Sequence, residues 1–251
     1  DIDYRPNLWG LAGHGAGEER YIKSDKVSQH LQTILADCDL IIGTEEEVHI
    51  AGGTEDTLEA LRKIRSLSTG VIVLKRGPMG CVVYPDAIPA SLDDGIVGKG
   101  FPIEVYNVLG AGDAFMSGFL SGWLEDATDE RCCQLANACG ALVVSRHACA
   151  PAMPTRAELD YLFNSPMPIT RPDQDQALQR LHQVSVPRKQ WQQLFVFAFD
   201  HRWQLLEMAQ QYGRDHASIC ALKQLFIKAV EQVETDVRQR GIDADVGLLA
   251  D

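Results

Sequence analysis

The sequence predicts an α/β fold, with a parallel sheet that carries helices on both of its faces. Strand-like and helix-like segments alternate over residues 1–163. The strand-like segments are almost uninterrupted apolar runs, which is typical of strands buried on both faces. A glycine-rich turn within residues 107–115 follows one of these strands. Because open α/β sheets bind ligands beyond the carboxyl ends of their strands, we expect the functional site at this turn.

Start and stop signals place the elements of this first part of the chain. Ser24 and Thr44 can each cap a helix, and the three glutamates after Thr44 suit the positive end of a helix dipole. Gly70 ends one helix, and Thr155 with Glu158 forms a capping box for another. The expected helices cover residues 24–38, 44 onward, 54–67, 111–125, 130–146 and 155 onward. The expected strands cover residues 1–4, 39–42, 71–74, 81–84 and 101–106, with a loop over 85–100.

The character of the chain changes after residue 163. Residues 164–190 contain four prolines and several glutamines, which predicts a linker with a short helix near 173–183. A second β/α segment follows over residues 191–251, and we expect it to be the start of an incomplete domain. Its expected strands and helices, in order, cover residues 194–199, 203–212, 217–240 and 246–251. Both ends of the chain have the pattern of strands cut from a longer protein.

Composition argues against several classes of protein. The 251 residues are 45% hydrophobic and carry a formal net charge of -12. No cluster of lysine and arginine makes the basic face that nucleic acid would need, and no apolar run is long enough to span a bilayer. The seven cysteines form no CxxC pair, so we expect reduced thiols in a cytoplasmic protein rather than a metal site. Assembly into a homo-oligomer stays open.

The turn Asn107-Val108-Leu109-Gly110-Ala111-Gly112-Asp113 carries the most specific chemistry in the chain. The backbone N–H groups of Gly110, Ala111 and Gly112 can point at one anion, and the helix that follows adds positive charge there. Asp113 lies beside that anion and can accept a proton. An anion hole next to a base suits the transfer of a phosphoryl group to a hydroxyl, although close packing alone also explains such a turn. No P-loop and no GxGxxG fingerprint after a strand occurs in the chain.

This turn, with Phe115 and Gly118 behind it, resembles the second signature of the ribokinase-like (PfkB) carbohydrate kinases. Other stretches resemble motifs of the same family in the same order, namely residues 1–9, 44–47 and 75–80, followed by Asn137 and Arg146. The resemblance covers residues 1–163 and implies the C-terminal part of a ribokinase-like kinase domain. The chain departs from the family pattern at five positions. Asn107 replaces an acidic residue, Val108 and Leu109 replace two threonines, Thr44 replaces an asparagine, and Ala148 replaces a frequent glycine.

The resemblance also implies roles for individual residues. Asp113 would be the catalytic base that takes the proton from a primary hydroxyl of the sugar. The other implied roles are ATP binding at Lys75, Gly77, Gly80 and Asn137, orientation of Mg²⁺ through water at Glu47, and a region for a monovalent cation such as K⁺ at Asn107 and Arg146. Structural roles compete with these: a hairpin needs the two glycines, a solvated helix turn suits the glutamate, and a core asparagine can satisfy backbone groups.

Within the family, the chain is similar to the branch that phosphorylates 5-dehydro-2-deoxygluconate in myo-inositol breakdown. The stretches that carry this similarity are residues 3–6, 43–47, 107–110 and 145–147. Residues 197–202 resemble the start of an aldolase-like (DUF2090-type) domain that is fused to some of these kinases, with Asp200 as its candidate site residue. One alternative is a kinase for fructose, ribose or 2-keto-3-deoxygluconate. The others are a nucleotide-binding fragment without turnover and the lyase activity of a fusion protein.

Overall fold

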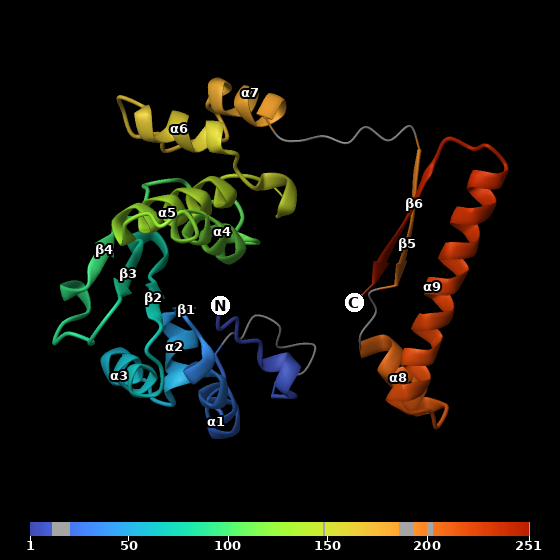
Figure 1. Cartoon of the computed structure of the whole chain (residues 1–251), viewed down its shortest axis with the longest axis horizontal. Coiled ribbons are helices and arrows are strands. Elements are labelled where there is room, and N and C mark those ends of the chain that lie inside the picture. The colour runs from blue at the N-terminus through green and yellow to red at the C-terminus, as the bar shows by residue number, and fades with distance from the viewer. Residues whose placement is uncertain (12–20, 148, 186–192, 200–202, 251) are drawn as a thin grey trace. The chain divides into compact units, whose positions relative to one another are not determined.

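The computed structural model describes residues 1–11, 21–147, 149–185, 193–199 and 203–250. The chain divides into two compact units, residues 1–186 and 187–251 (Figure 1). The larger unit contains a four-stranded sheet with strand order β1-β2-β3-β4. Its strands are β1 (Leu40–Thr44), β2 (Val71–Lys75), β3 (Cys81–Tyr84) and β4 (Ile96–Gly98).

The sheet is mixed rather than purely parallel. Strands β1 and β2 are parallel, whereas β3 pairs antiparallel with both β2 and β4. The tight turn at Gly77–Met79 sends the chain straight back beside β2, and such a short connection can join only antiparallel neighbours. The predicted α/β class with ribokinase-like character is confirmed, and the parallel arrangement holds for β1 and β2 alone.

Helices cover both faces of this sheet, as the sequence predicts. Helices α2 (Glu45–Gly52) and α3 (Thr57–Leu67) pack on one face, and α4 (Ala111–Trp123) and α5 (Asp129–Val144) on the other. Helix α1 (Asp25–Ile34) packs beside α2, whereas α6 (Arg156–Asn164) and α7 (Gln176–Ser185) pack against α4 and α5.

The caps predicted at Ser24 and Thr44 are present: the Ser24 hydroxyl accepts a hydrogen bond from the Val27 N–H, and Thr44 and Glu47 form a capping box. The limits predicted for α3 are wrong, because its N-cap is Asp56 and its C-cap is Ser68 rather than Gly70. Each cap satisfies N–H groups that the first helical turn leaves unpaired.

Alternate residues of each strand supply two separate cores. Ile41, Ile72 and Leu74 pack against helices α2 and α3. Ile42 and Val73 face the other way and pack against α4 and α5. This alternation follows from the two-residue period of a strand. Helices α4 and α5 lie side by side over the sheet (Figure 1). The N-terminus of α4 is thereby held at the carboxyl end of the sheet.

Close packing of α4 on α5 depends on Gly118. A Cβ atom at Gly118 would lie 2.6 Å from the Leu135 carbonyl oxygen and 2.8 Å from the Ala136 Cα, so backbone would have to move. We expect Gly118→Ala to lower the free energy of unfolding by roughly 1–3 kcal/mol, the usual cost of overpacking. Urea denaturation measures the change.

Gly140, in α5, is the matched control for this substitution. Its added Cβ would make ordinary contacts, at 3.6 Å from the Ala111 oxygen and 3.9 Å from the Phe115 Cβ. Because alanine is the better helix former, Gly140→Ala should be neutral or stabilising by up to about 1 kcal/mol. Equal stability of the two variants would contradict the packing argument.

Three segments differ from the sequence expectations. Residues 101–106 are not a strand: the Tyr106 N–H donates to the Val144 carbonyl at the end of α5, and the Glu104 N–H donates to Thr170. Residues 1–4 also lie outside the sheet, although the Ile2 N–H donates to the Ile42 carbonyl at 2.8 Å. The expected loop over residues 85–100 contains the short strand β4. A regular strand needs a neighbouring strand along its length, and residues 101–106 bond to a helix end and a turn instead.

Helix α7 lies within the region that the sequence predicts as a linker, close to the expected short helix. Its Leu178 is fully buried in the core cluster that α4, α5 and α6 share. The Asp175 carboxylate caps this helix by accepting hydrogen bonds from the Ala177 and Leu178 N–H groups. Residues up to Ser185 therefore pack as part of the larger unit.

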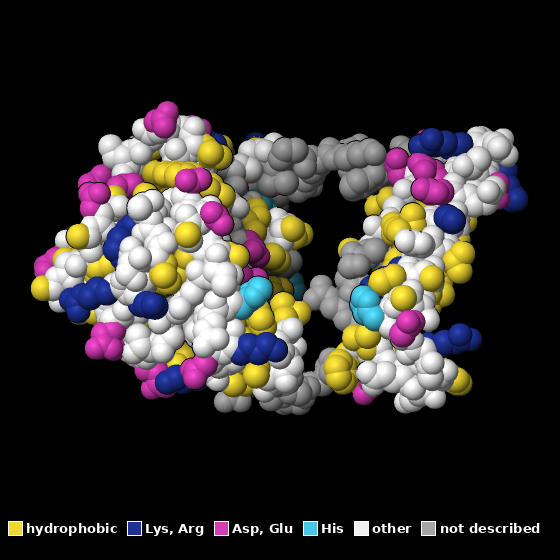
Figure 2. Space-filling model, turned by 60° about the horizontal axis from the view of Figure 1, so that its bottom comes forward, with side chains coloured by type: hydrophobic (Ala, Val, Ile, Leu, Met, Phe, Trp, Pro, Cys, Tyr) yellow, Lys and Arg dark blue, Asp and Glu magenta, His cyan; other side chains and the backbone are white. Residues whose placement is uncertain are grey.

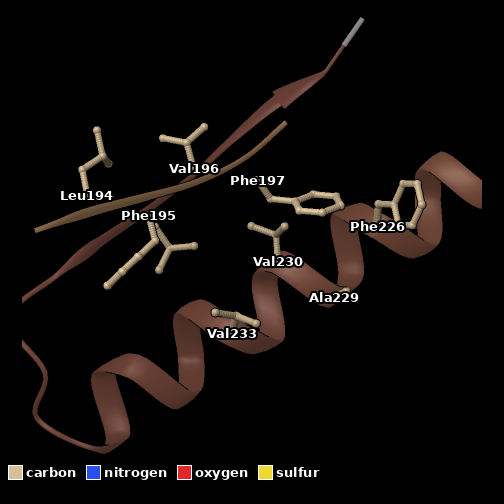
Figure 3. Close-up of a pocket in the computed structure, with 9 residues that line it drawn as sticks. Leu194, Phe195, Val196, Phe197, Phe226, Ala229, Val230 and Val233 are labelled. Atoms are coloured by element: carbon tan, nitrogen blue, oxygen red, sulfur yellow. The ribbon is translucent and has the colours of Figure 1, made fainter. Parts of the chain in front are cut away.

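The smaller unit is a β/α segment, as predicted. Strands β5 (Leu194–Phe199) and β6 (Asp245–Ala250) are parallel neighbours, and helices α8 (Trp203–Gln211) and α9 (His216–Gln239) connect them. Phe195 and Phe197 point from β5 toward α9, whereas Leu194 and Val196 point away from it (Figure 3). The rings of Phe197 and Phe226 meet edge to face, with centroids 5.4 Å apart.

Much apolar surface of the smaller unit is exposed. Leu194 and Val196 of β5 are exposed, and so are Trp203, Met208 and Leu225 of the helices. Hydrophobic side chains are visible on the surface of these helices in the space-filling view (Figure 2). In the described part of the chain, no helix is both long and apolar enough to cross a membrane.

Candidate active site

The larger unit contains a cavity of about 480 Å³ at the carboxyl ends of β1 and β2. Most of the predicted site residues line it. They are Glu47, Lys75, Gly77, Gly80, Gly110, Ala111, Gly112, Asp113 and Asn137. These residues come from four separate stretches of the chain, so their convergence depends on the fold and not on sequence proximity.

Pairing of β1 with β2 brings the acidic and basic groups of the site together. Thr44 and Lys75 are register partners at the ends of the two parallel strands, and α2 begins directly after Thr44. The Glu47 carboxylate accepts a hydrogen bond from the Thr44 N–H at 2.7 Å and lies 3.5 Å from the Lys75 Nζ. Glu47 therefore caps a helix and faces the cavity at the same time.

The turn before α4 is built on a left-handed glycine. Gly110 has φ of 82° and is the N-cap residue of the helix. A Cβ atom at this position would also lie 2.4 Å from the Cys149 Sγ, so both the conformation and the space require glycine. This geometry places Asp113 in the first turn of the helix with its side chain exposed to the cavity.

The anion hole differs in one respect from the sequence expectation. The Ala111 N–H donates to the Val108 carbonyl at 3.2 Å and is therefore occupied. The next two amides, of Gly112 and Asp113, make no hydrogen bond within the described residues. These two N–H groups, together with the positive end of the α4 dipole, can hold an anion beside the Asp113 carboxylate.

The two glycines of the nucleotide-side turn have different reasons to be glycine. Gly80 has φ of +91°, and a Cβ there would lie 2.0 Å from the Gly98 carbonyl oxygen. Packing of the hairpin thus accounts for Gly80. Gly77 has φ of +56° and no atom within 4 Å of an added Cβ, so it leaves open space at the edge of the cavity. Close approach of a ligand to the backbone is therefore available at Gly77.

Asn137 combines a structural contact with a place in the cavity wall. Its side-chain amide donates to the Gly98 carbonyl at 3.1 Å and also contacts the Cys81 Sγ at 3.4 Å. A hydrogen bond with Cys133 lowers the pKa of the Cys81 thiol, and this outweighs the effect of burial. All seven cysteines of the chain are free thiols, as the sequence predicts. Adenine contact at Asn137 stays a prediction.

Three charged residues at the start of the chain also line the cavity, and they were not among the predicted site residues. The Asp1 carboxylate lies 2.9 Å from the Lys75 Nζ, and the Arg5 guanidinium lies 2.8 Å from the Asp3 carboxylate. The sequence signal for these residues is the charged motif at residues 1–5, which belongs to the stretch that resembles the family. The hydrogen bond from Ile2 to β1 holds this segment against the sheet.

The two residues predicted for a monovalent-cation region do not line the cavity. The Asn107 side chain accepts a hydrogen bond from the Leu109 N–H at 3.0 Å and so shapes the turn. Arg146 forms an ion pair with the fully buried carboxylate of Glu158. Its guanidinium also donates to the Ala152 carbonyl, so this geometry gives no support for a cation role. Asp200 lies outside the described residues.

The Glu158 carboxylate is the centre of a buried polar cluster. Burial alone would raise its pKa, but hydrogen bonds from the Thr155 N–H and from His182, together with the Arg146 charge, hold the pKa below its ordinary value. His182, in α7, also contacts the Pro151 carbonyl at 2.8 Å. The cluster therefore joins the end of α5, the start of α6 and helix α7.

Two family models match this chain. The model described as pfkB family carbohydrate kinase matches residues 18–156, which is more than half of the chain. The model described as an uncharacterized protein conserved in bacteria (DUF2090) matches residues 158–251. The first match contains the cavity residues from Glu47 to Asn137, and the second begins within α6.

Curated relatives agree with the first match. The chain is 29% identical over 164 residues to a 5-dehydro-2-deoxygluconokinase of Geobacillus kaustophilus, covering 64% of this chain and 44% of that protein. It is 26% identical over 167 residues to a protein of the same name in Bacillus licheniformis, covering 65% and 46%. The chain thus spans about half the length of these relatives.

A comparison of folds finds aminoimidazole riboside kinase from Salmonella enterica, solved with aminoimidazole riboside and an ATP analog. Its TM-score is 0.50 at 20% identity, covering 65% of this chain and 50% of that chain. At this level of identity the likeness concerns the fold alone.

Proposed function

The chain belongs to the pfkB family of carbohydrate kinases, and from this premise we propose that it carries the phosphoryl-transfer half of an ATP-dependent sugar kinase. One observation supports the proposal above all. A single cavity contains an exposed carboxylate at Asp113, two unpaired amides beside it, and the open turn at Gly77. A phosphoryl donor, a base and an anion hole can therefore meet in one place.

In the proposed reaction, Asp113 accepts the proton of a primary hydroxyl as the sugar oxygen attacks the γ-phosphorus of ATP. The bond from phosphorus to the sugar oxygen forms while the bond to the ADP oxygen breaks. The amides of Gly112 and Asp113 stabilise the charge on the group in transit, since they are already oriented before reaction. ADP and a sugar phosphate leave.

The cavity also fits a magnesium ion. Mg²⁺ keeps several of its waters and needs only one or two carboxylates, and Glu47 would orient it through water from the cavity wall. In the described residues no group of three or more acidic, histidine or cysteine side chains forms a complete metal cage. Bound there, Mg²⁺ would neutralise charge on the phosphates of ATP. A requirement for K⁺ remains a proposal from the family resemblance.

For the substrate we propose 5-dehydro-2-deoxygluconate, which would place the protein in myo-inositol breakdown. The names of the relatives suggest this sugar acid. The cavity offers Arg5, whose guanidinium is more than half exposed and can bind a carboxylate as its fork geometry allows. Fructose and ribose have no carboxylate, so neither sugar could form this ion pair with Arg5. The acid 2-keto-3-deoxygluconate is the nearest alternative.

We propose a domain layout with a kinase domain over residues 1–163, a connecting segment over 164–190 whose helix α7 packs on the kinase domain, and the start of an aldolase-like β/α domain over 191–251. The parallel pair β5 and β6, joined through helices, supports the last part. Lyase activity would need more strands than these two, because barrel sites are assembled from the ends of several strands.

A comparison of substrates tests the proposed function. In the intact protein with ATP and Mg²⁺, we expect ADP formation with 5-dehydro-2-deoxygluconate at a kcat/KM at least about 100-fold above that for fructose or ribose, because a site built around a charged group rejects analogues that lack it. A preference for 2-keto-3-deoxygluconate would move the assignment to the alternative acid. Equal rates with neutral sugars would overturn the sugar-acid proposal.

A further inference from the structure

The ammonium group of Lys75 is held between two carboxylates at the cavity wall. Its Nζ lies 2.9 Å and 3.0 Å from the two carboxylate oxygens of Asp1 and 3.5 Å from the Glu47 carboxylate. The Lys75 side chain is only 11% exposed. A long, flexible side chain is thereby restrained to one position at the end of β2.

This position is next to the unpaired amides before Asp113. A Cβ atom built on Gly112 would lie 3.8 Å from the Lys75 Nζ, and no other atom of the described residues beyond its chain neighbours and its own helix backbone comes within 4 Å. Gly112 has no side chain to stand between its own N–H and this ammonium. The cation and the two open amides of Gly112 and Asp113 therefore border the same small space.

The charges that line the cavity show why a cation is needed there. Carboxylates of Asp1, Asp3, Glu47 and Asp113 line it, against the two cations Arg5 and Lys75. Arg5 is paired with Asp3, whereas Lys75 is the cation whose ammonium lies near Gly112. A triphosphate would meet net negative charge in this cavity. Lys75 stands where it can offset both the acidic wall and the phosphate.

We propose that Lys75 is a catalytic residue whose ammonium donates hydrogen bonds to the oxygens of the phosphoryl group in transit, and that Asp1 and Glu47 position it. The inference rests on the proposed kinase activity and deepens it. Lys75 keeps its proton throughout: the hydroxyl proton goes to Asp113, one P–O bond forms and one breaks. The positive charge of Lys75 stabilises the negative charge that spreads over the transferred phosphoryl group.

The first test compares Lys75→Met and Lys75→Gln with the parent in the intact protein. We expect kcat to fall roughly 10²–10³-fold, as for loss of one fixed donor to a developing negative charge. Lys63→Met, on the exposed face of α3, is the matched control and should keep the parent rate. A kcat within threefold of the parent in a folded Lys75 variant would overturn the proposal.

A second readout separates this role from a merely structural ion pair. Calorimetric titration gives the affinities for ADP and for a non-hydrolysable ATP analogue, each with Mg²⁺. The parent should bind the triphosphate more tightly, and Lys75→Met should lose this preference while its affinity for ADP stays within about threefold. An unchanged preference would contradict contact with the terminal phosphoryl group.

If both Lys75 variants fail to fold, chemical modification of the parent protein tests the same proposal. The rate of acetylation at Lys75 and Lys63 is measured by peptide mass mapping. The triphosphate analogue should slow acetylation of Lys75 well beyond the effect of AMP and leave Lys63 unchanged; equal protection of Lys75 by AMP and the analogue would overturn the inference. Parent protein that binds no triphosphate and phosphorylates no sugar would instead contradict the kinase proposal itself.

Discussion

Replacing Asp113 by asparagine should lower kcat for sugar phosphorylation by about 10²–10⁴-fold, the range for loss of a general base. Asparagine keeps the size of the side chain in the first turn of α4, but it cannot accept the hydroxyl proton. The KM for ATP should change little, because the amides of Gly112 and Asp113 are backbone groups that the substitution retains. Steady-state kinetics with ATP and sugar varied in turn measure both effects.

Asp160→Asn provides the control for this substitution. Asp160 is an exposed aspartate of α6 and does not line the cavity. Its replacement should leave both kcat and KM at the parent values. If Asp113→Asn retained more than a tenth of the parent kcat, Asp113 would not be the base, and the proton would have to pass to solvent or to another group.

Replacing Arg146 by methionine should lower the free energy of unfolding by about 3–5 kcal/mol, because it leaves a buried carboxylate without its partner. The Glu158 carboxylate is 0% exposed, and the Arg146 guanidinium pairs with it directly. Denaturation in urea measures the loss. A role for Arg146 in binding a cation predicts a different result, namely reduced activity at unchanged stability.

The control is Arg156→Met, which removes an ion pair of the same kind from the surface. Arg156 and Glu125 are 3.2 Å apart, with side chains 48% and 66% exposed. Solvent screens this pair, so its loss should cost at most about 1 kcal/mol. Similar losses for the two arginine variants would contradict the distinction between buried and exposed pairs.

The acid limb of the stability curve gives an independent check on Glu158. The pKa of Glu158 is lowered in the folded protein, so its contribution to stability is present above its unfolded pKa, about 4.3, and is lost as pH falls through the folded value. We therefore expect the difference in stability between the parent and Arg146→Met to shrink below about pH 4. A difference that stayed constant into the acid range would argue against a charged Glu158.

The elements predicted best are those with a strong local pattern. Strand β3 was expected at residues 81–84, where four apolar residues follow a glycine turn, and the structure has it there. Residues 101–106 have an equally strand-like composition, yet they lack a strand partner because their amides bond to the end of α5 and to Thr170. Strand β4 went unpredicted because three residues in a loop-like stretch become a strand only through pairing with β3. Strand pairing depends on the whole fold, so it is hard to recognise from the sequence of a single segment.

The site was predictable where one local motif carries it. The turn from Gly110 to Asp113 was located from its small residues and the helix that follows. The contact between Lys75 and Asp1 joins residues 74 positions apart, and it depends on the register of β1 with β2 and on the segment beside them. Likewise, the engagement of the Ala111 amide by Val108 follows from the exact path of the turn. The ion pair of Arg146 could not be predicted either, because its partner Glu158 lies in the next helix, and the cation role of Arg146 stays a prediction.

We propose that this cavity transfers the γ-phosphoryl group of ATP to a sugar hydroxyl. Phosphorus NMR of the intact protein turning over ATP, Mg²⁺ and 5-dehydro-2-deoxygluconate tests it directly. We expect one phosphomonoester on the primary hydroxyl for each ADP formed, and neither product when Asp113 is replaced by asparagine. Inorganic phosphate in place of the phosphomonoester, or a phosphomonoester formed at the parent rate by the Asp113→Asn variant, would contradict the account.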